Sequence, residues 1–279
     1  MKIGILHPGE MGVSVAASAI NSGHQVYWVS QGRSKDTRAR AEKYHLKEVT
    51  SLSELSQICE ILLSVCPPDA AQATAQSVID AGFHGLYLDA NAIAPGRTIN
   101  IGQNMKDAGI HFVDGGIVGG PTWTPKETWL YLSGEYANEI AACFSKGPLE
   151  TKIIGKEIGK ASALKICYAA YSKGTTALLA AILAVAESLE VREDLYEQWD
   201  REYEGFSDEV SKRVMRVIIK AWRFEGEMRE IAETFQEAGL PSGFHESAAD
   251  IYHRLSNIKN IAPLPSLEQL LAAIHRETE

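Results

Sequence analysis

The sequence predicts an α/β domain built on a parallel sheet, followed by an all-α domain. In the first half, short apolar runs alternate with helical stretches, which is typical of a parallel sheet covered on both faces by helices. Beyond Gly155–Gly159 we find no further convincing strand, only successive helices. We therefore expect two domains, residues 1–158 and 159–279, in a chain of 279 residues that is long enough for both.

The expected strands of the first domain are short, apolar and bounded by turn-forming residues. They are Lys2–Leu6, Gln25–Ser30, Lys47–Thr50, Ile61–Val65, Leu86–Asp89, His111–Asp114, Trp129–Ser133 and Lys152–Ile154. Helices are expected between them, at Val13–Asn21, Ser34–Tyr44, Leu52–Ile58, Ala70–Ala81, Pro95–Ala108 and Glu139–Phe144.

The second domain begins with a long alanine- and leucine-rich helix over Lys160–Leu189, with an expected disturbance at Gly174. Further helices are expected at Arg192–Trp199, Ser207–Trp222, Glu227–Ala238, Gly243–Ser256 and Ser266–His275. Gly239-Leu240-Pro241 is a clear break between two of them.

Composition narrows the function classes. The net charge of -9 argues against broad binding of nucleic acid or of anionic membranes. The four cysteines have no Cys-x-x-Cys spacing, so we expect reduced thiols, a cytoplasmic location and no metal site. The chain begins with a core strand instead of a signal peptide, and its most apolar segment, Ala177–Leu189, is too short to span a membrane.

The first turn, His7-Pro8-Gly9-Glu10-Met11-Gly12, lies between an expected strand and an expected helix. It resembles the dinucleotide-binding fingerprint Gly-x-Gly-x-x-Gly, with His7 in place of the first glycine. A side chain at Gly9 would keep a pyrophosphate away from the helix N-terminus, and one at Gly12 would keep the helix off the sheet. An ordinary strand-to-helix turn is the alternative. The position favours a Rossmann-like domain that holds a dinucleotide through residues 7–11.

The end of the second strand selects between the two nicotinamide cofactors. NAD-binding domains usually carry an acidic residue there for the ribose 2′-hydroxyl. Here Ser30 is followed by Gln31, Gly32, Arg33 and Ser34, with Lys35, Arg38 and Arg40 close behind. Arg33 and Ser34 could hold a 2′-phosphate, which favours NADP over NAD. A solvated basic helix start is the alternative.

Two loops follow the carboxyl ends of later strands, where open parallel sheets bind their ligands. Val65, Cys66 and Pro67 would line the ribose, and Asn91 would lie near the nicotinamide. A third, glycine-rich segment covers Asp114–Pro121, and its backbone at Val118-Gly119-Gly120 could form an anion nest for a substrate carboxylate. A flexible crossover loop would explain the same glycines.

Lys165 lies in an apolar helix of small residues. Loss of solvation would lower its pKa towards the range in which an amine serves as a general acid/base. From periodicity alone, a lysine at such a position is more often a surface residue whose stem packs on apolar neighbours.

Together these motifs resemble the β-hydroxyacid dehydrogenase superfamily, which includes 3-hydroxyisobutyrate and 6-phosphogluconate dehydrogenases. The resemblance rests on Gly9-x-x-Gly12, Asn91–Pro95, Asp114–Gly120 and Lys165. His7–Gly12 and Lys173–Leu179 are further typical of a subgroup with a C-terminal domain of unknown function. The resemblance implies a Rossmann-like domain, a long interdomain helix and an all-α domain that often helps to form a homodimer. It also implies that Lys165 is the catalytic acid/base, exchanging the hydroxyl proton while hydride moves to or from the nicotinamide.

The chain departs from that family at its substrate contacts. Val118 replaces a serine, Ala169 replaces an asparagine four residues after Lys165, and Glu227 falls where a second lysine is expected. Tyr168 could supply a hydroxyl in place of the asparagine, and His245 is a further candidate substrate contact, although a lone histidine on a helix is more often structural. We therefore expect a substrate that is larger, more aromatic or less anionic than the usual hydroxyacid.

The sequence thus predicts an NADP-dependent oxidoreductase acting on a hydroxyacid or a related alcohol. An imine reductase-like enzyme is one alternative, although such enzymes usually replace this lysine. A non-catalytic NADP-binding sensor is another.

Overall fold

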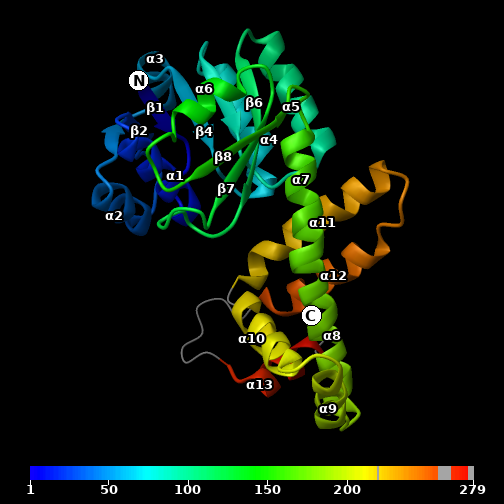
Figure 1. Cartoon of the computed structure of the whole chain (residues 1–279). Helices are drawn as coiled ribbons and strands as arrows, with labels where there is room; N and C mark the ends of the chain where they lie inside the picture. Colours follow the sequence, from blue (N-terminus) through cyan, green and yellow to red (C-terminus); the bar gives the residue numbers. More distant parts are fainter. Residues whose placement is uncertain (219, 257–264, 276–279) are drawn as a thin grey trace. The chain divides into compact units, whose positions relative to one another are not determined.

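The structure is a computed structural model that describes residues 1–218, 220–256 and 265–275. It divides into two compact units, Met1–Ile166 and Cys167–Glu279 (Figure 1). The units divide inside helix α7 (Lys160–Ala169), whereas the sequence-based division after residue 158 assigns the whole helix to the second domain.

The first unit is built on one eight-stranded sheet in the order β3-β2-β1-β4-β5-β6-β7-β8. Strands β1 to β6 are mutually parallel, β7 runs antiparallel to β6, and β8 is parallel to β7. The strands are β1 (Lys2–Ile5), β2 (Gln25–Val29), β3 (Lys47–Val49), β4 (Ile61–Ser64), β5 (Leu86–Asp89), β6 (His111–Val118), β7 (Trp129–Ser133) and β8 (Glu150–Gly155). The predicted α/β class with a parallel sheet is confirmed, and the sheet contains one antiparallel pair, β6 with β7.

Strand β6 is also longer than predicted. The glycines that follow Asp114 suggest a loop, yet Asp114–Val118 continues the strand and pairs with β7. A Cβ at Gly115 would lie 2.8 Å from a side-chain carbon of Leu88, and one at Gly116 would lie 2.5 Å from the carbonyl oxygen of Ala161. These glycines therefore permit close packing of β6 against its neighbours.

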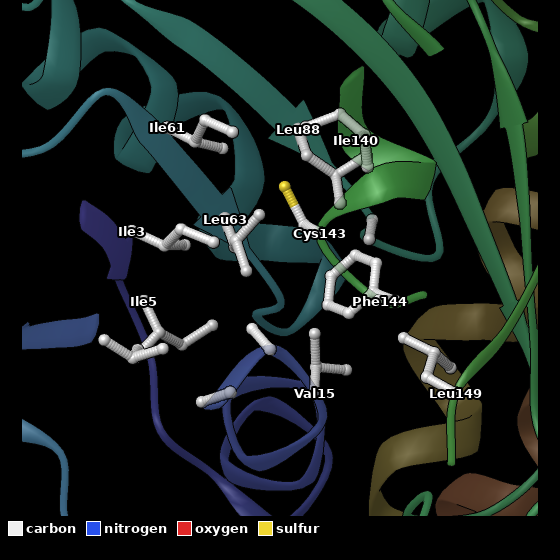
Figure 2. Close-up of a cluster of buried hydrophobic side chains, with 14 of the residues drawn as sticks. Ile3, Ile5, Val15, Ile61, Leu63, Leu88, Ile140, Cys143, Phe144 and Leu149 are labelled. Atoms are coloured by element: carbon white, nitrogen blue, oxygen red, sulfur yellow. The ribbon is translucent and has the colours of Figure 1, made fainter. Parts of the chain in front are cut away.

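Two hydrophobic clusters cover the two faces of the sheet. One packs β1, β4 and β5 against α1 (Glu10–Asn21) and α6 (Ala137–Ala142), and Figure 2 shows Ile3, Leu63, Val15 and Phe144 meeting in it. The other lies beneath α3 (Leu52–Ile58), α4 (Ala71–Asp80) and α5 (Pro95–Asp107). Helix α2 (Lys35–Lys43) adds Ala41 to the first cluster. This two-sided burial explains the continuous apolar runs of the central strands.

Asp114 joins the sheet to the start of α7. Its Oδ2 accepts hydrogen bonds from the backbone N–H groups of Gly159 (2.8 Å), Ala161 (3.0 Å) and Ser162 (3.2 Å). Ser133 Oγ donates to the same oxygen at 2.9 Å, and Ser162 Oγ donates to Oδ1 at 2.6 Å. Burial raises the pKa of Asp114, while these hydrogen bonds act in the opposite direction. A carboxylate in this position satisfies N–H groups that a helix start cannot pair internally.

The described secondary-structure elements of the second unit are all helices. A π-helical turn, η2 (Ala170–Gly174), follows α7, close to the predicted disturbance at Gly174. The next helix after α10 begins earlier than predicted, at Ala221 and not at Glu227, while residue 219 of the predicted helix Ser207–Trp222 lies outside the described residues. The helices are α8 (Thr175–Ser188), α9 (Arg192–Glu202), α10 (Phe206–Ile218), α11 (Ala221–Glu237), α12 (Gly243–Arg254) and α13 (Leu267–Ile274).

Side chains from two helices donate to carbonyls of η2, and a third helix contacts the Lys173 side chain. Arg213 of α10 donates through Nη2 to the carbonyl of Ser172 at 2.7 Å, and Tyr252 of α12 donates to that of Lys173 at 2.8 Å. The Lys173 ammonium forms a buried ion pair with Glu227 of α11 and lies 4.7 Å from the Phe224 ring centroid. A π turn leaves carbonyls without their usual helical partners, so these contacts stabilise it.

The helical segment Lys160–Ser188 is long and apolar enough to cross a membrane by length and composition alone. In its most apolar window, 44% of the residues are buried within the protein. A core helix of a water-soluble protein passes the same test, so the segment is weak evidence for a membrane span.

We expect Asp114→Asn to destabilise the first unit by roughly 3 kcal/mol, because an amide cannot accept the same set of charge-assisted hydrogen bonds. Denaturant unfolding should show this loss in the transition of the first unit. Asp107→Asn is the control, since the exposed Asp107 carboxylate accepts a bond from Gln103 and should change stability by less than about 0.5 kcal/mol. Equal stability of the two variants would contradict the anchoring role of Asp114.

Candidate active site

The turn between β1 and α1 is shaped to approach an anion. Gly9 is the N-cap residue of α1, and no side chain caps that end by hydrogen bonding. No capping side chain therefore competes with a ligand for the positive end of the helix dipole. A Cβ at Gly9 would meet nothing within 4 Å, whereas one at Gly12 would collide with the carbonyl oxygen of His7. Gly12 serves helix packing, and Gly9 leaves open space of the kind a pyrophosphate group requires.

His7, at the position of the missing first glycine, is held neutral. Burial, and secondarily the charge of Arg33, lower the pKa of His7 to about 4. Its Nδ1 is buried without a hydrogen-bond partner in the described part of the chain. Pro8 beside it is buried, and the carbonyl of Pro8 accepts a hydrogen bond from Arg40 Nη1 of α2 at 3.1 Å. Glu10 is exposed and Met11 half-buried in the first turn of α1.

His7 and Arg33 line one pocket of about 270 Å³ beside the ends of β1 and β2. Its other walls are mostly apolar and come from β1, β2, α3, η1 (Pro68–Ala70) and α4. The Arg33 Nη2 donates to the carbonyl of Leu6 at 2.8 Å, which fixes the guanidinium beside the pocket. An apolar slot with a guanidinium at its rim suits the adenosine half of a dinucleotide. The remaining lining residues are Leu6, Val29, Leu52, Ala70, Ala73, Thr74 and Ser77.

The two serines at the end of β2 already have partners. Ser34 caps α2 by accepting a hydrogen bond from the backbone N–H of Thr37 at 3.2 Å. Ser30 is buried and its hydroxyl donates to Glu48 of β3. Ser34 is exposed, so its hydroxyl remains accessible to an incoming ligand.

The loops after β4 and β5 are fastened to one another by Asn91. Its Oδ1 accepts from the Cys66 backbone N–H at 2.6 Å, and its Nδ2 donates to Ser64 Oγ at 3.0 Å. Both polar ends of the buried Asn91 side chain are therefore used inside the protein. Val65 is half-buried and Pro67 exposed on the same loop. Asn91 orders this edge of the sheet whether or not it also contacts a nicotinamide.

Lys165 lies against the extended part of β6. A Cβ at Gly116 would be 3.0 Å from the Lys165 Cβ, so only a glycine lets α7 come this close. Asp114 pairs with Asp89, the last residue of β5, and Gly116 therefore lies beyond the carboxyl end of that strand. This places the base of the half-buried Lys165 side chain at the ligand-binding edge of the sheet.

The glycines after β6 again divide into two kinds. Gly119 has a φ of +124°, and a Cβ there would lie 2.6 Å from the Glu127 carbonyl oxygen. Gly120 is exposed and a Cβ there would meet nothing within 4 Å, although its carbonyl accepts a bond from Thr128 Oγ1 at 2.7 Å. Val118, half-buried, ends the strand. Gly120 thus leaves open surface for an approaching group, as Gly9 does.

Two further candidates belong to the second unit. Tyr168 is 47% exposed, and the position of Ala169 next to it is buried. The His245 ring is buried against Phe235 (4.3 Å between ring centroids) and Phe244 (5.0 Å) and close to Gly174. Burial lowers the pKa of His245. Its setting in this unit is that of a packed core histidine.

Three arrangements are absent from the sequence-based set of site residues: the capping role of Asp114, the Arg40 contact to Pro8, and the Lys173–Glu227 ion pair. Each joins residues far apart in the chain, so local patterns carry no signal for it. For Glu227, the only hint was its unexpected charge. Among the described residues, no three His, Cys, Asp or Glu side chains come together in a way that could hold a metal ion.

Comparison with known proteins matches one segment in each half of the chain to a protein family. Residues 2–140 match the NAD binding domain of 6-phosphogluconate dehydrogenase, and residues 186–255 match a domain of unknown function, DUF1932. An uncharacterized 28.5 kDa protein of Methanothermus fervidus is 28% identical over 234 residues, which cover 83% of this chain and 89% of the relative. A putative 6-phosphogluconate dehydrogenase of Bacillus subtilis is 27% identical, with 80% and 73% covered.

Solved structures share the fold. A 3-hydroxyisobutyrate dehydrogenase of Mycobacterium tuberculosis superposes with a TM-score of 0.73 at 15% identity, over 99% of each chain. An imine reductase of Myxococcus stipitatus in complex with NADP+ reaches a TM-score of 0.59 at 14% identity, over 92% of this chain and 94% of that chain. The fold is therefore that of NAD(P)-binding hydroxyacid dehydrogenases and imine reductases.

The glycine turn and the pocket beside β1 and β2 lie within the matched NAD-binding segment, and Lys165 lies between the two matched segments. The chain belongs to the β-hydroxyacid dehydrogenase superfamily, as a member in which a DUF1932 domain follows the NAD-binding domain.

Proposed function

We propose that the protein is an NADP-dependent oxidoreductase that transfers hydride between the nicotinamide and a hydroxyacid or related alcohol. The observation that carries the proposal is the position of Lys165 against Gly116, at the carboxyl edge of the sheet that also bears the open turn at Gly9. Proton and hydride transfer require a titratable group and a dinucleotide site on the same edge.

Lys165 is the proposed general acid/base. As a neutral amine it accepts the proton of the substrate hydroxyl, and as an ammonium it returns a proton to the alkoxide in the reverse direction. Bound NADP supplies the hydride acceptor. Asp114 acts at a distance from this chemistry, because its hydrogen bonds to the start of α7 fix the helix that carries Lys165.

Lys165→Met should lower kcat by roughly 10²- to 10⁴-fold, the usual contribution of a positioned acid/base, with NADPH affinity unchanged. The measurement is turnover against a panel of aromatic and sugar hydroxyacids, together with NADPH titration by fluorescence. Lys160→Met is the matched control, since this exposed lysine begins the same helix and pairs with Glu157. Full turnover by the Lys165 variant would exclude the acid/base role.

Selection of NADP is assigned to Arg33 and Ser34, next to the pocket that suits adenosine. The Arg33 guanidinium is already oriented by Leu6, and Ser34 is exposed at the start of α2. Charge-assisted bonds to a 2′-phosphate from these groups favour NADP over NAD.

Arg33→Ala should weaken NADPH binding by roughly 10- to 100-fold, because a charge-assisted hydrogen bond contributes about 1.5–3 kcal/mol, and should change NADH binding far less. Titration of both reduced cofactors measures the two losses. Arg201→Ala, an exposed arginine of α9 in the second unit, controls for the change in net charge. Equal losses for NADPH and NADH would rule out the 2′-phosphate contact.

The substrate site is proposed at the Val118-Gly119-Gly120 segment of the first unit. Tyr168 and His245, in the second unit, stay predictions from the sequence alone. Gly120 offers exposed backbone without a side chain, while Val118 brings an apolar side chain where the family resemblance implies a serine. The Asn91 loop and Cys66 with its neighbours would line the nicotinamide and its ribose. These features favour a substrate that is more apolar than a simple hydroxyacid.

Imine reduction is the second candidate function, because imine reductases share this two-domain fold. The retained Lys165 favours the dehydrogenase, since imine reductases usually replace it. A non-catalytic NADP-binding protein would bind the cofactor and yet convert none of the panel.

We further propose a homodimer formed through the helical unit. Leu178, Ile182 and Val185 of α8 and its C-cap residue Leu189 follow the 4-3-4 spacing of a helix–helix seam. Three of these four are exposed: Leu178 at 44%, Val185 at 53% and Leu189 at 65%.

The net charge of -9 and four free cysteines support a cytoplasmic protein without nucleic-acid or membrane partners.

Val185→Lys should convert the dimer to a monomer, because an ammonium would be buried in the seam. Light scattering on a size-exclusion column measures the mass directly. Ser188→Lys adds the same charge to the same helix at a position outside the spacing, and should leave the mass unchanged. A dimer that survives both substitutions would place the interface elsewhere.

A further inference from the structure

The end of β2 has no acidic residue of its own, but Glu48 of the neighbouring strand β3 places a carboxylate there. Glu48 of β3 is in register with Trp28 of β2. Its carboxylate accepts a hydrogen bond from the hydroxyl of Ser30, the residue that follows β2. Glu48 therefore reaches the part of the sheet where ribose-binding acids lie in NAD-binding domains, although it does so from another strand.

The same carboxylate restrains an arginine. Arg38 Nη1 of α2 lies 3.5 Å from Glu48 Oε1, and Arg38 Nη2 donates to the Ser30 carbonyl at 2.7 Å. Ser30, Arg38 and Glu48 thus form a closed triangle at the end of β2. The guanidinium has one edge on a carbonyl and the other near a carboxylate.

This triangle bears directly on recognition of a 2′-phosphate. A phosphate dianion beside Ser30 would be attracted by Arg38 and repelled by Glu48. It would also compete with Glu48 for the guanidinium edge. A ribose 2′-hydroxyl carries no charge and meets neither effect, and it could donate to the carboxylate instead.

We propose that Glu48 is a specificity-determining residue that holds Arg38 and thereby weakens the preference for NADP over NAD. The inference rests on the proposed dinucleotide function. In this arrangement Arg33 attracts the 2′-phosphate without competition from a carboxylate. Arg38 contributes to phosphate binding only when its contact with Glu48 is broken. The protein accordingly retains usable affinity for NADH.

The triangle can be altered without loss of the fold. Side-chain exposure is 47% for Arg38 and 57% for Glu48, and ion pairs at such exposed positions contribute little to stability. Glu48→Gln keeps an oxygen for the Ser30 hydroxyl and removes only the charge. An unchanged melting temperature would show that the variant is folded.

Glu48→Gln should tighten NADPH and 2′-AMP binding by roughly three- to tenfold, the scale of a partly exposed charge interaction, and leave NADH and 5′-AMP within about twofold. Calorimetric or fluorescence titration measures all four. Glu60→Gln is the matched control, because the Glu60 carboxylate accepts from the backbone N–H of Lys2 at the amino ends of β1 and β4, away from the end of β2. In an Arg38→Gln background, Glu48→Gln should give a clearly smaller gain, because it then relieves only the direct repulsion of the phosphate.

Unchanged NADPH affinity in Glu48→Gln, or an equal gain for NADH, would overturn the inference. So would an equal gain in the absence of Arg38, because Glu48 would then act as a distant charge and not through the arginine. Failure of the unaltered protein to bind NADPH and NADH at all would instead remove the proposed function. The two failures are therefore distinguishable.

Discussion

The hydrogen bonds from the start of α7 to the Asp114 carboxylate hold the candidate site together. One buried carboxylate accepts from three backbone N–H groups and two hydroxyls, and so joins β6, β7 and α7 at a single point. The glycines after Asp114 then let the helix lie directly on the strand. These two constraints, one polar and one steric, fix the position of the helix backbone at Lys165.

The glycines near the candidate site differ in the space that surrounds them. Gly12, Gly116 and Gly119 are places where a Cβ would strike another part of the protein. Gly9 and Gly120 are places where a Cβ would meet nothing, so the fold itself does not demand them. The proposed cofactor and substrate sites require open backbone of this kind at Gly9 and Gly120.

Much of the architecture is readable from local pattern, because strand and helix periodicity recur in order through residue 155. The turn at Gly9 and Gly12 is equally local. Strand β6 beyond Asp114 is not, since glycines that permit close packing have the same composition as glycines that form a loop. The ion pairs Arg38–Glu48 and Lys173–Glu227 form only when strands and helices pack. The sequence around each residue therefore does not predict its partner. The early start of α11 is similar, because Trp222 and Phe224 do not reveal by themselves that a helix has begun.

The π turn at η2 has a consequence for any residue-by-residue equivalence with relatives whose helix is regular. An α-helix advances about 100° per residue, and a wider turn holds an additional residue in nearly the same rotation. Counting forward from Lys165 therefore identifies equivalent faces only as far as Ala169. Beyond Gly174, a side chain that matches by number lies about a quarter-turn away from its apparent counterpart, and Lys173 sits within the turn itself, where a numerical match has no fixed direction.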